Sequence, residues 1–287
     1  MPSTTTISID KLVRLVGTPH CPVLVDVRTD DDYKRNPRLI PSSMRRPYAD
    51  PSAWADEFVG RSAIVICQKG TKVSQGTAAW LRHAGVPADA LEDGFEGWRA
   101  AGLPLVTATR MPPLDSQRRT VWVTRSRPKV DRIACPWLIR RFIDPRAVFL
   151  FVAPAEVEGV AERFAATLFD VEGVFWGHRG ETCTFDVMID EFGLATEPLI
   201  RLAAIVRGAD TGRIRRPARR FAGAVTHVCR RPCPTRSRDG TLRRLLPMVP
   251  RRHGRNPHRA FEAIGRLKCP RHRRRQARRP VPERGAP

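Results

Sequence analysis

The sequence contains no apolar run that approaches the roughly 18 residues of a membrane-spanning helix. Its first residues, Met-Pro-Ser-Thr-Thr-Thr, have neither the basic region nor the apolar core of a secretory signal peptide. No internal repeat is present along the chain. These absences argue against a membrane protein and against export, and they predict a cytoplasmic protein.

The cysteines form no regular pattern. There are seven of them, an odd number without even spacing, which does not suit a disulfide framework. Such usage fits a reducing compartment, which agrees with a cytoplasmic location. The cysteines are therefore predicted to be free thiols or metal ligands.

Acidic residues are scarce in only one part of the chain. The formal net charge is +22, but residues 213–287 hold 24 lysines and arginines against three acidic residues. Residues 1–212 hold 27 basic and 26 acidic groups and are nearly neutral. No basic nucleic-acid-binding face is predicted for that larger part.

Residues 213–287 contain 23 arginines and 10 prolines and no periodic apolar pattern longer than one turn. Such a segment cannot bury enough apolar surface to offset its ordering entropy, so we predict a disordered basic tail. One interpretation is a nucleic-acid-binding tail, since clustered arginines neutralise phosphates. The other is a frameshifted C-terminus, since GC-rich DNA read out of frame encodes these residue types. The scarcity of aromatic residues favours the second.

Residues 64–74, Ile-Val-Ile-Cys-Gln-Lys-Gly-Thr-Lys-Val-Ser, place a cysteine between a buried strand and a helix. Ser74 is predicted to be the N-cap of that helix, which ends near His83. Cys67 is therefore expected at the carboxyl end of a strand and in front of a helix N-terminus, where amides and lysines stabilise a thiolate. A free cysteine is more often a core residue than a nucleophile, but this loop favours the nucleophile.

Residues 1–107 alternate strand and helix signals, which predicts an α/β domain. Strands are expected over residues 23–27, 64–66 and 90–92, and helices over residues 9–16, 52–59, 74–83 and 95–101. Short strands joined by crossover helices predict a parallel sheet with its site at the carboxyl ends of the strands.

A proline-bearing linker is predicted over residues 108–119, followed by a second, smaller α/β or α+β domain over residues 120–212. Its expected strands cover residues 121–123, 149–152 and 174–176. Its expected helices cover residues 136–142, 157–169, 185–192 and 198–206. Pro136 is expected in the first turn of its helix.

Motifs within residues 5–106 resemble, in order, those of a single-domain rhodanese. They are Leu-Val-Asp-Val-Arg at 24–28, Leu-Ile-Pro-Ser-Ser at 39–43, Cys-Gln-Lys-Gly-Thr-Lys at 67–72, and Asp-Gly-Phe-Glu-Gly-Trp at 93–98 with Ala-Gly-Leu-Pro at 101–104. The resemblance implies a parallel sheet with helices on both faces and a sulfurtransferase that needs no cofactor. The Cys67 thiolate would take the outer sulfur of thiosulfate or another sulfane donor, release sulfite, and pass the persulfide sulfur to a thiol or to cyanide.

Substrate would bind in the loop that follows the cysteine, formed by Gln68, Lys69, Gly70, Thr71 and Lys72. Inward-pointing amides hold a persulfide anion, and Gly70 permits a left-handed turn. Lys69 and Lys72 are either donors for a dianionic substrate or ordinary solvated charges.

Related phosphatase and arsenate-reductase loops carry an arginine six residues after the cysteine. Here that position is Val73 and the cation, Lys72, comes at five, which favours sulfur over phosphate. Leu39 and Ser42 depart from the histidine and glycine usual in the rhodanese family.

Asp26 and Arg28 look like the pair that supports the rhodanese loop from behind. Their expected role is structural, with Asp26 accepting hydrogen bonds from amides of the loop.

Residues 120–212 resemble the C-terminal domain of the chromate-resistance (ChrB-like) family. The resemblance rests on Lys-Val-Asp-Arg-Ile-Ala-Cys-Pro-Trp-Leu at 129–138, Gly-His-Arg-Gly-Glu-Thr-Cys-Thr-Phe-Asp at 177–186 and Val-Arg-Gly-Ala-Asp-Thr at 206–211. Members of that family are described as chromate-responsive regulators or as exported resistance proteins.

His178, Cys183 and Asp186 fall within nine residues and supply nitrogen, sulfur and oxygen donors, so they are a candidate transition-metal site. The alternative is ordinary hydrogen-bonded structure near a turn. Cys135, directly before Pro136, is a candidate low-pKa thiol.

The favoured interpretation is a sulfurtransferase whose nucleophile is Cys67, with thiosulfate or another sulfane donor and a thiol acceptor as partners. The competing interpretation is a non-enzymatic sensor whose loop binds a tetrahedral dianion such as chromate or sulfate.

Overall fold

The computed structural model describes residues 5–127 and 129–211 of the chain. The chain divides into two units, and all the described residues belong to the first of them, Met1–Ala224. The predicted basic tail, residues 213–287, lies outside the described residues.

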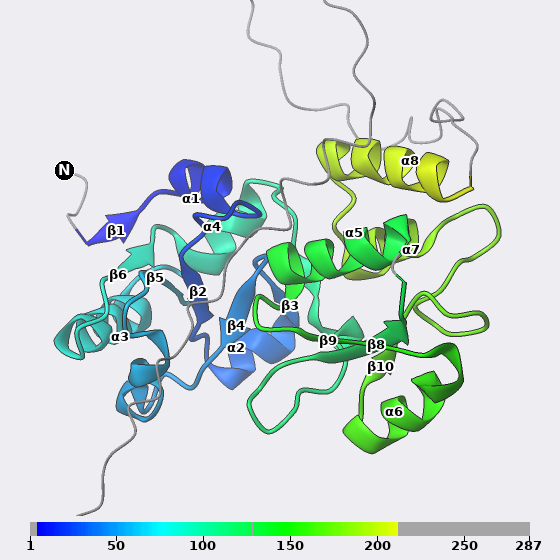
Figure 1. Ribbon diagram of the computed structural model, residues 1–287. Helices are drawn as coiled ribbons and strands as arrows, with labels where there is room; N and C mark the ends of the chain where they lie inside the picture. The colour runs from blue at the N-terminus through cyan, green and yellow to red at the C-terminus, as the bar shows by residue number, and fades with distance from the viewer. Residues whose placement is uncertain (1–4, 128, 212–287) are drawn as a thin grey trace, which may run out of the picture. The chain divides into compact units, whose positions relative to one another are not determined.

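The first domain is built on a five-stranded parallel sheet with the strand order β1-β6-β5-β2-β4 (Figure 1). Its strands are β1 (Thr6–Ile7), β2 (Val23–Asp26), β4 (Ser43–Arg45), β5 (Ala63–Ile66) and β6 (Ala88–Leu91). Its helices are α1 (Ile9–Leu15), α2 (Asp30–Arg35), α3 (Lys72–His83) and α4 (Gly94–Ala100), with the 3₁₀ segments η1 (Pro51–Ala53) and η2 (Ala55–Phe58).

Side chains of the two central strands alternate between two apolar clusters, as the period of a strand requires. Val25 and Val65 lie in one cluster with side chains from α3 and η2, whereas Leu24 and Ile64 lie in the other with side chains from α1 and α4. Helices therefore cover both faces of the sheet, and the predicted α/β class with a parallel sheet is confirmed.

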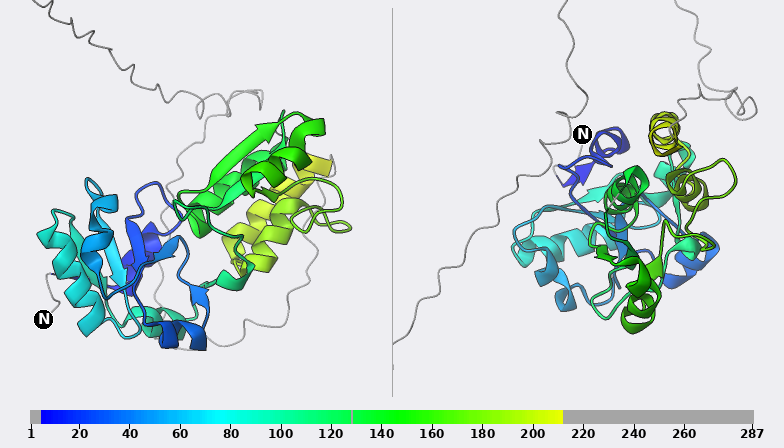
Figure 2. Two further views of the ribbon diagram at one scale, coloured as in Figure 1. Left: turned by 90° about the horizontal axis from the view of Figure 1, so that it is seen from below. Right: turned by 45° about the vertical axis from the view of Figure 1, so that its right-hand side comes forward.

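The second domain contains a three-stranded sheet, order β10-β8-β9, in which both strand pairs are parallel. Its strands are β8 (Val121–Arg125), β9 (Val148–Val152) and β10 (Thr167–Leu168). Its helices are α5 (Val130–Leu138), α6 (Val157–Phe164), α7 (Thr184–Phe192) and α8 (Glu197–Thr211), with the π-helical segment η4 (Ile139–Ile143) and the 3₁₀ segment η5 (Pro154–Glu156). Figure 2 shows α7 and α8 lying side by side.

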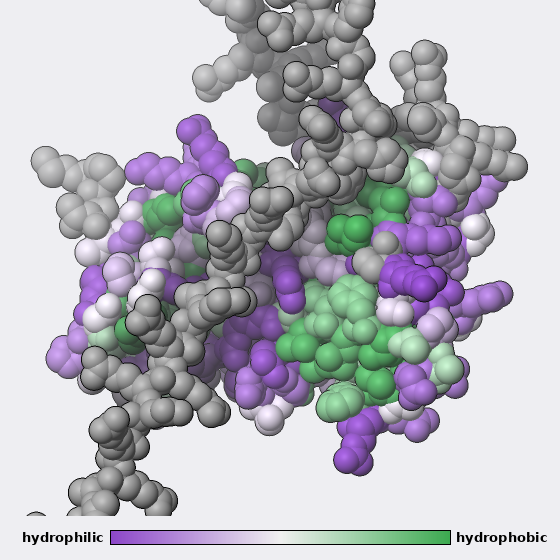
Figure 3. Space-filling model, in the orientation of Figure 1, coloured by the Kyte–Doolittle hydropathy of each residue, from purple (hydrophilic) through white to green (hydrophobic). Residues whose placement is uncertain are grey.

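Aromatic rings fill much of the core of this domain. Trp122 contacts Phe169 and Trp176 edge to face, and Trp176 stacks on Phe192 with ring centroids 4.7 Å apart. Not all apolar side chains are covered, because Phe151 on β9 is exposed. Figure 3 shows apolar surface in the region of β8 and β9.

A short antiparallel pair, β3 (Arg38–Leu39) with β7 (Val106–Thr107), links the two domains. Leu39 and Val106 are buried in the same cluster as Trp122 and Phe169. After β7, the predicted linker contains one 3₁₀ turn, η3 (Ala108–Arg110), and a bridge between Leu114 and Thr120. Neither β3 nor β7 was predicted, because two-residue strands carry no periodic signal.

Ser42, which stands where the rhodanese resemblance expects glycine, adopts a φ of 65°. This is the left-handed region that favours glycine. Its amide donates a hydrogen bond of 2.6 Å to the carbonyl of Phe142, so a contact from the second domain accompanies the unusual conformation. The departure in sequence therefore leaves a glycine-like backbone in place.

The predicted position of Pro136 in the first turn of a helix was wrong. Helix α5 begins at Val130, so Pro136 lies inside it, and the segment continues into the π-helix η4. A proline in a helix interior cannot donate to the carbonyl four residues earlier. A change of helical pitch close to such a residue is a known response.

Two further elements differ from the prediction. The helix expected over residues 157–169 ends at Phe164, where Ala165 takes a left-handed conformation, and Thr167–Leu168 then pairs with β8. The strand expected over residues 174–176 is a turn in which Trp176 forms a single bridge with Phe169. Pairing with β8 overrides the local pattern at residues 167–168, and burial of the Trp176 ring does so at residues 174–176.

Candidate functional site

Cys67 lies at the carboxyl end of the central strand β5, as predicted, and is 5% exposed. Its Sγ donates a hydrogen bond of 3.1 Å to Oγ of Ser74, which in turn donates to the carbonyl of Thr71. The prediction that Ser74 is the N-cap of the helix was therefore wrong. Thr71 occupies that position, and Ser74 lies in the first turn of α3 beside the thiol.

Two glycines allow the loop after Cys67 to lie directly against the start of α4. Gly70 has a φ of 69°, and a Cβ added there would lie 2.4 Å from the carbonyl oxygen of Leu91. A Cβ added to Gly94 would lie 2.3 Å from the carbonyl oxygen of Cys67. The amide of Phe95 donates 2.9 Å to that same oxygen. Backbone packing thus fixes the loop.

The loop presents hydrogen-bond donors that the described residues do not use. Among those residues, no carbonyl or side chain accepts from the amides of residues 68–71, and Thr71 offers no side-chain cap to the first turn of α3. Lys69 and Lys72 are exposed, while Gln68 Nε2 donates 3.0 Å to Glu96. Free amides at the start of a 12-residue helix suit an anion.

Asp26 and Arg28 form a buried ion pair behind this loop. Arg28 Nε lies 2.8 Å from Asp26 Oδ2, and its guanidinium also donates to the carbonyls of Asn36 and Arg38. The same guanidinium lies 3.7 Å from the ring centroid of Phe95 in α4. The prediction that Asp26 accepts hydrogen bonds from loop amides was wrong, because the amide that donates to Asp26 is that of Arg28. The pair ties the end of β2 to α4.

The structure does not bring together the three predicted metal ligands. Cys183 is the N-cap of α7, and its amide donates 3.0 Å to Asp186 Oδ2 in a capping box. Asp186 also pairs with Arg207 at 2.6 Å. These two residues therefore hold a helix end, whereas His178 points into a different group of side chains.

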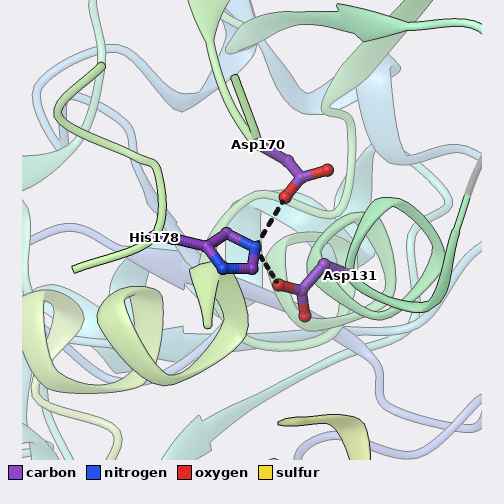
Figure 4. A group of neighbouring side chains, drawn as sticks. All are labelled: Asp131, Asp170 and His178. Atoms are coloured by element: carbon purple, nitrogen blue, oxygen red, sulfur yellow. Dashed lines mark ion pairs between the residues drawn. The ribbon is translucent and has the colours of Figure 1, made fainter. Parts of the chain in front are cut away.

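That group, which we call the His178 cluster, consists of His178, Asp131, Asp170 and Asp210 (Figure 4 shows the first three). Nε2 of His178 lies 3.2 Å from Asp131 Oδ2, 3.3 Å from Asp170 Oδ1 and 3.6 Å from Asp210 Oδ2. Asp131 lies in the first turn of α5, Asp170 follows β10, and Asp210 lies near the end of α8. Three segments distant in sequence thus converge on one imidazole.

Thr184 fastens the two buried aspartates of the cluster. Its amide donates 2.9 Å to Asp131 Oδ2, and its hydroxyl donates 2.9 Å to Asp170 Oδ1. Burial raises the pKa of Asp131 to about 6 although the Thr184 amide donates to it, and the negative charges of Asp170 and Asp210 add to the rise. The cluster is therefore rich in negative charge.

A sequence signal for this cluster exists but is weak. Asp131 and Asp210 each lie in a string that resembles the ChrB-like family, and Asp170 directly follows the aromatic end of an apolar run. Nothing in the spacing connects them, because 79 positions separate Asp131 from Asp210.

Comparison with known protein families matches residues 8–101 to the rhodanese-like domain and residues 122–244 to the ChrB C-terminal domain. The chain joins a rhodanese-like domain to a ChrB C-terminal domain. The second match continues beyond the last described residue, and the domain limits given above from the sequence stay predictions.

Among curated proteins, the chain is similar to Protein ChrB of Cupriavidus metallidurans, with 38% identity over 109 residues. The aligned part is 36% of this chain and 31% of that protein, so the chain spans about a third of the length of this relative.

Two solved structures illustrate the similarity of the rhodanese-like domain. A rhodanese-like domain protein from Staphylococcus aureus is 24% identical, with a TM-score of 0.29, and the alignment covers 33% of this chain and 91% of that one. A rhodanese-related protein from Thermoplasma volcanium is 20% identical, with a TM-score of 0.30, and the alignment covers 36% and 97%.

Cys135 in the ChrB C-terminal domain is not the low-pKa thiol considered above. It is completely buried, and burial raises its pKa well above the ordinary value, with Asp131 and Asp170 adding to the rise. Arg132, in the same helix, places Nε 2.9 Å from Asp170 Oδ2. Both residues thus belong to the interior around the His178 cluster.

A cavity of about 790 Å³ lies away from both sites. Its lining includes Tyr33, Arg45, Arg46, Arg118 and Pro145, and neither Cys67 nor His178 is among the lining residues. Within the described ranges, 5–127 and 129–211, no helix has the length and apolar character needed to cross a lipid bilayer.

Proposed function

We propose that the rhodanese-like domain is a thiosulfate sulfurtransferase in which Cys67 is the nucleophile and the carrier of a persulfide. The observation that carries this proposal is the position of Cys67 Sγ beside the uncapped first turn of α3, next to loop amides without partners among the described residues. Donors arranged in this way stabilise a sulfur anion before the substrate arrives.

The reaction would proceed in two displacements. The Cys67 thiol first loses its proton to solvent, and Sγ then attacks the outer sulfur of thiosulfate. A new S–S bond forms to Cys67, the S–S bond of thiosulfate breaks, and its electron pair leaves with sulfite. An acceptor thiolate next attacks the outer sulfur of the persulfide, and the Cys67 thiolate is regenerated. No cofactor enters this cycle.

Each feature of the loop has a role in this cycle. The amides of residues 68–71 would donate to the outer sulfur of the persulfide, which carries the negative charge between the two steps. Exposed Lys69 and Lys72 would attract dianionic thiosulfate. A free thiol acceptor requires a reducing compartment, so we place the reaction in the cytoplasm.

The ChrB C-terminal domain would link this chemistry to chromate resistance. A strain that depends on this protein for growth in chromate should lose protection when Cys67 is replaced by serine. Unchanged protection would separate the sulfur chemistry from resistance.

Steady-state transfer of sulfur from thiosulfate to cyanide tests the activity directly. Cys67→Ser should abolish turnover, because a serine hydroxyl with no nearby base is a poor nucleophile and cannot form a persulfide. Cys21→Ser, which alters a half-buried thiol of the same domain, is the matched control and should retain it. After treatment with thiosulfate, wild-type protein should gain the mass of one sulfur atom on the peptide that contains Cys67.

The competing function makes a different set of predictions. A sensor would bind chromate or sulfate in the same loop, with affinity lost in Lys72→Ala, and would show neither turnover nor a persulfide. Wild-type protein without turnover and without the added sulfur mass would therefore overturn the sulfurtransferase proposal.

A further inference from the structure

The His178 cluster contains a buried carboxylate that its surroundings do not neutralise. Asp131 is completely buried, and its Oδ1 has no hydrogen-bond partner among the described residues. Its other oxygen accepts from the Thr184 amide and faces His178. A buried carboxylate normally has a cation or a full set of donors. Among the described residues no lysine or arginine pairs with Asp131, and His178 is the group of possible positive charge beside it.

The donor atoms of the cluster already have the spacing of a metal site. One ligand atom from each of Asp131, Asp170 and His178 lies within 4.8 Å of the others, and the two contacts to Nε2 measure 3.2 and 3.3 Å. Metal–ligand bonds of about 2.0–2.2 Å at tetrahedral or octahedral angles separate neighbouring ligands by roughly 3.0–3.5 Å. An ion could therefore lie among these atoms with little movement of the side chains.

The surroundings of the three residues also suit a bound ion. Thr184 donates to one oxygen of each aspartate, and Arg132 lies on the far oxygen of Asp170, so both carboxylates are held in place. Ligands fixed by outer hydrogen bonds in this way are characteristic of metal sites. The His178 side chain is 44% exposed and provides a route of entry from solvent.

We propose that Asp131, Asp170 and His178 bind a divalent transition-metal ion, with Asp210 as a nearby further oxygen donor. One imidazole nitrogen with carboxylate oxygens is a donor set that suits manganese(II) or zinc(II). Cys183 is not part of the ligand set, because the donor atoms that lie within 4.8 Å of one another belong to Asp131, Asp170 and His178. The proposal is independent of Cys67 and of sulfur transfer.

Manganese(II) binding to the full-length protein, followed by electron paramagnetic resonance, tests the site. This probe is chosen because manganese(II) prefers oxygen and nitrogen ligands and so avoids the cysteines of the chain. His178→Ala should bind one equivalent less than wild type, or bind it at least tenfold more weakly. His20→Ala, which removes an exposed histidine of the other domain, and Cys67→Ser should match wild type.

The comparison between variants is essential, since residues 213–287 contain further histidines and cysteines, which are potential metal ligands. Thermal unfolding provides the second measurement. Manganese(II) should raise the melting temperature of wild type and of His20→Ala but not of His178→Ala or His178→Gln. Equal binding and equal thermal shifts in wild type and in both His178 variants, with manganese(II) and with zinc(II), would overturn the proposal. The three aspartates and His178 would then have a structural role.

Discussion

The Cys67 loop and the His178 cluster are organised in opposite ways. Around Cys67, the groups without partners in the described residues are donors, namely the amides of residues 68–71. Around His178, the unsatisfied atom is an acceptor, Oδ1 of Asp131. The first site is made by one contiguous segment and its contact with α4, whereas the second is made by side chains from α5, the segment after β10 and α8.

This difference separates the chemistry of the two domains. Donors from the backbone hold an anion without depending on side-chain charge, so the Cys67 loop suits a substrate that comes and goes. Converging buried carboxylates are stabilised when a cation or a proton neutralises them, so the His178 cluster suits an ion that stays. The experiments below change one site at a time and compare the responses.

The largest difference is expected from removing one carboxylate charge in each domain. Asp26→Asn leaves the buried guanidinium of Arg28 without its counter-charge and should lower the free energy of unfolding by about 3–5 kcal/mol. Asp170→Asn also breaks a buried pair, with Arg132, but it relieves repulsion with Asp131 and should cost less. Urea denaturation without added metal measures both.

Asp30→Asn is the control for this comparison, because it breaks an exposed pair with Arg45 and should change stability by about 0–1 kcal/mol. Saturating manganese(II) should stabilise wild type but not Asp170→Asn. The difference in free energy of unfolding between the two proteins should therefore be larger with the metal than without it. A metal-free Asp170→Asn protein as unstable as Asp26→Asn would contradict the repulsion that we infer in the cluster.

A methyl group in the loop should disturb the first site alone. Gly70→Ala places a Cβ 2.4 Å from the carbonyl oxygen of Leu91 at a positive φ, and should cost about 2–4 kcal/mol of stability together with most of the sulfur-transfer activity. Gly76 lies on the exposed side of α3, where a new Cβ meets no atom within 4 Å. Gly76→Ala should therefore raise the free energy of unfolding by about 0.5–1 kcal/mol. Retained activity in Gly70→Ala would show that the loop tolerates another backbone.

Lys72→Ala should weaken catalysis by on the order of tenfold, about 1.4 kcal/mol, because the first residue of α3 loses its attraction for dianionic thiosulfate. The loss should shrink at high salt, where screening already removes part of that attraction. Lys11→Ala, an exposed lysine in α1, should leave the kinetics unchanged. If the catalytic rate of Lys72→Ala depends on salt concentration as that of wild type does, Lys72 is an ordinary solvated charge.

The smallest effect concerns Glu57, which lies between Arg46 and Arg146 at 2.5 and 2.9 Å. Burial opposes its ionisation, but hydrogen bonds and charge from both arginines outweigh that and lower its pKa. A carboxylate whose pKa is lower in the folded state stabilises the folded protein at pH values above its unfolded-state pKa, which is about 4.3. This stabilisation is lost as the pH falls through the folded-state pKa. Glu57→Gln should therefore lose about 0–1 kcal/mol at pH 7 and match wild type in acid.

Sequence patterns predicted those parts of the molecule whose determinants are contiguous. Strands β2 and β5 and helix α3 were found because each carries its own apolar run, and Cys67 followed from the order of strand, loop and helix. The N-cap of α3 was predicted at Ser74 but lies at Thr71, because the sequence pattern cannot show that the loop turns at Gly70 and packs against α4.

The His178 cluster could not be predicted in the same way. The sequence grouped His178 with its neighbours Cys183 and Asp186, but a capping box occupies those two residues. Its actual partners are brought to it by the packing of α5 and α8 on α7. Only the tertiary arrangement contains that information.

The short pair formed by β3 and β7 has a consequence for how the two domains lose their structure. Leu39 and Val106 belong by sequence to the rhodanese-like half, yet they are buried among the aromatic rings of the other half. Melting either half would expose the apolar surface of its neighbour, so both should unfold in one cooperative transition. Neither half is then an interchangeable module, and each depends on the other for part of its interior.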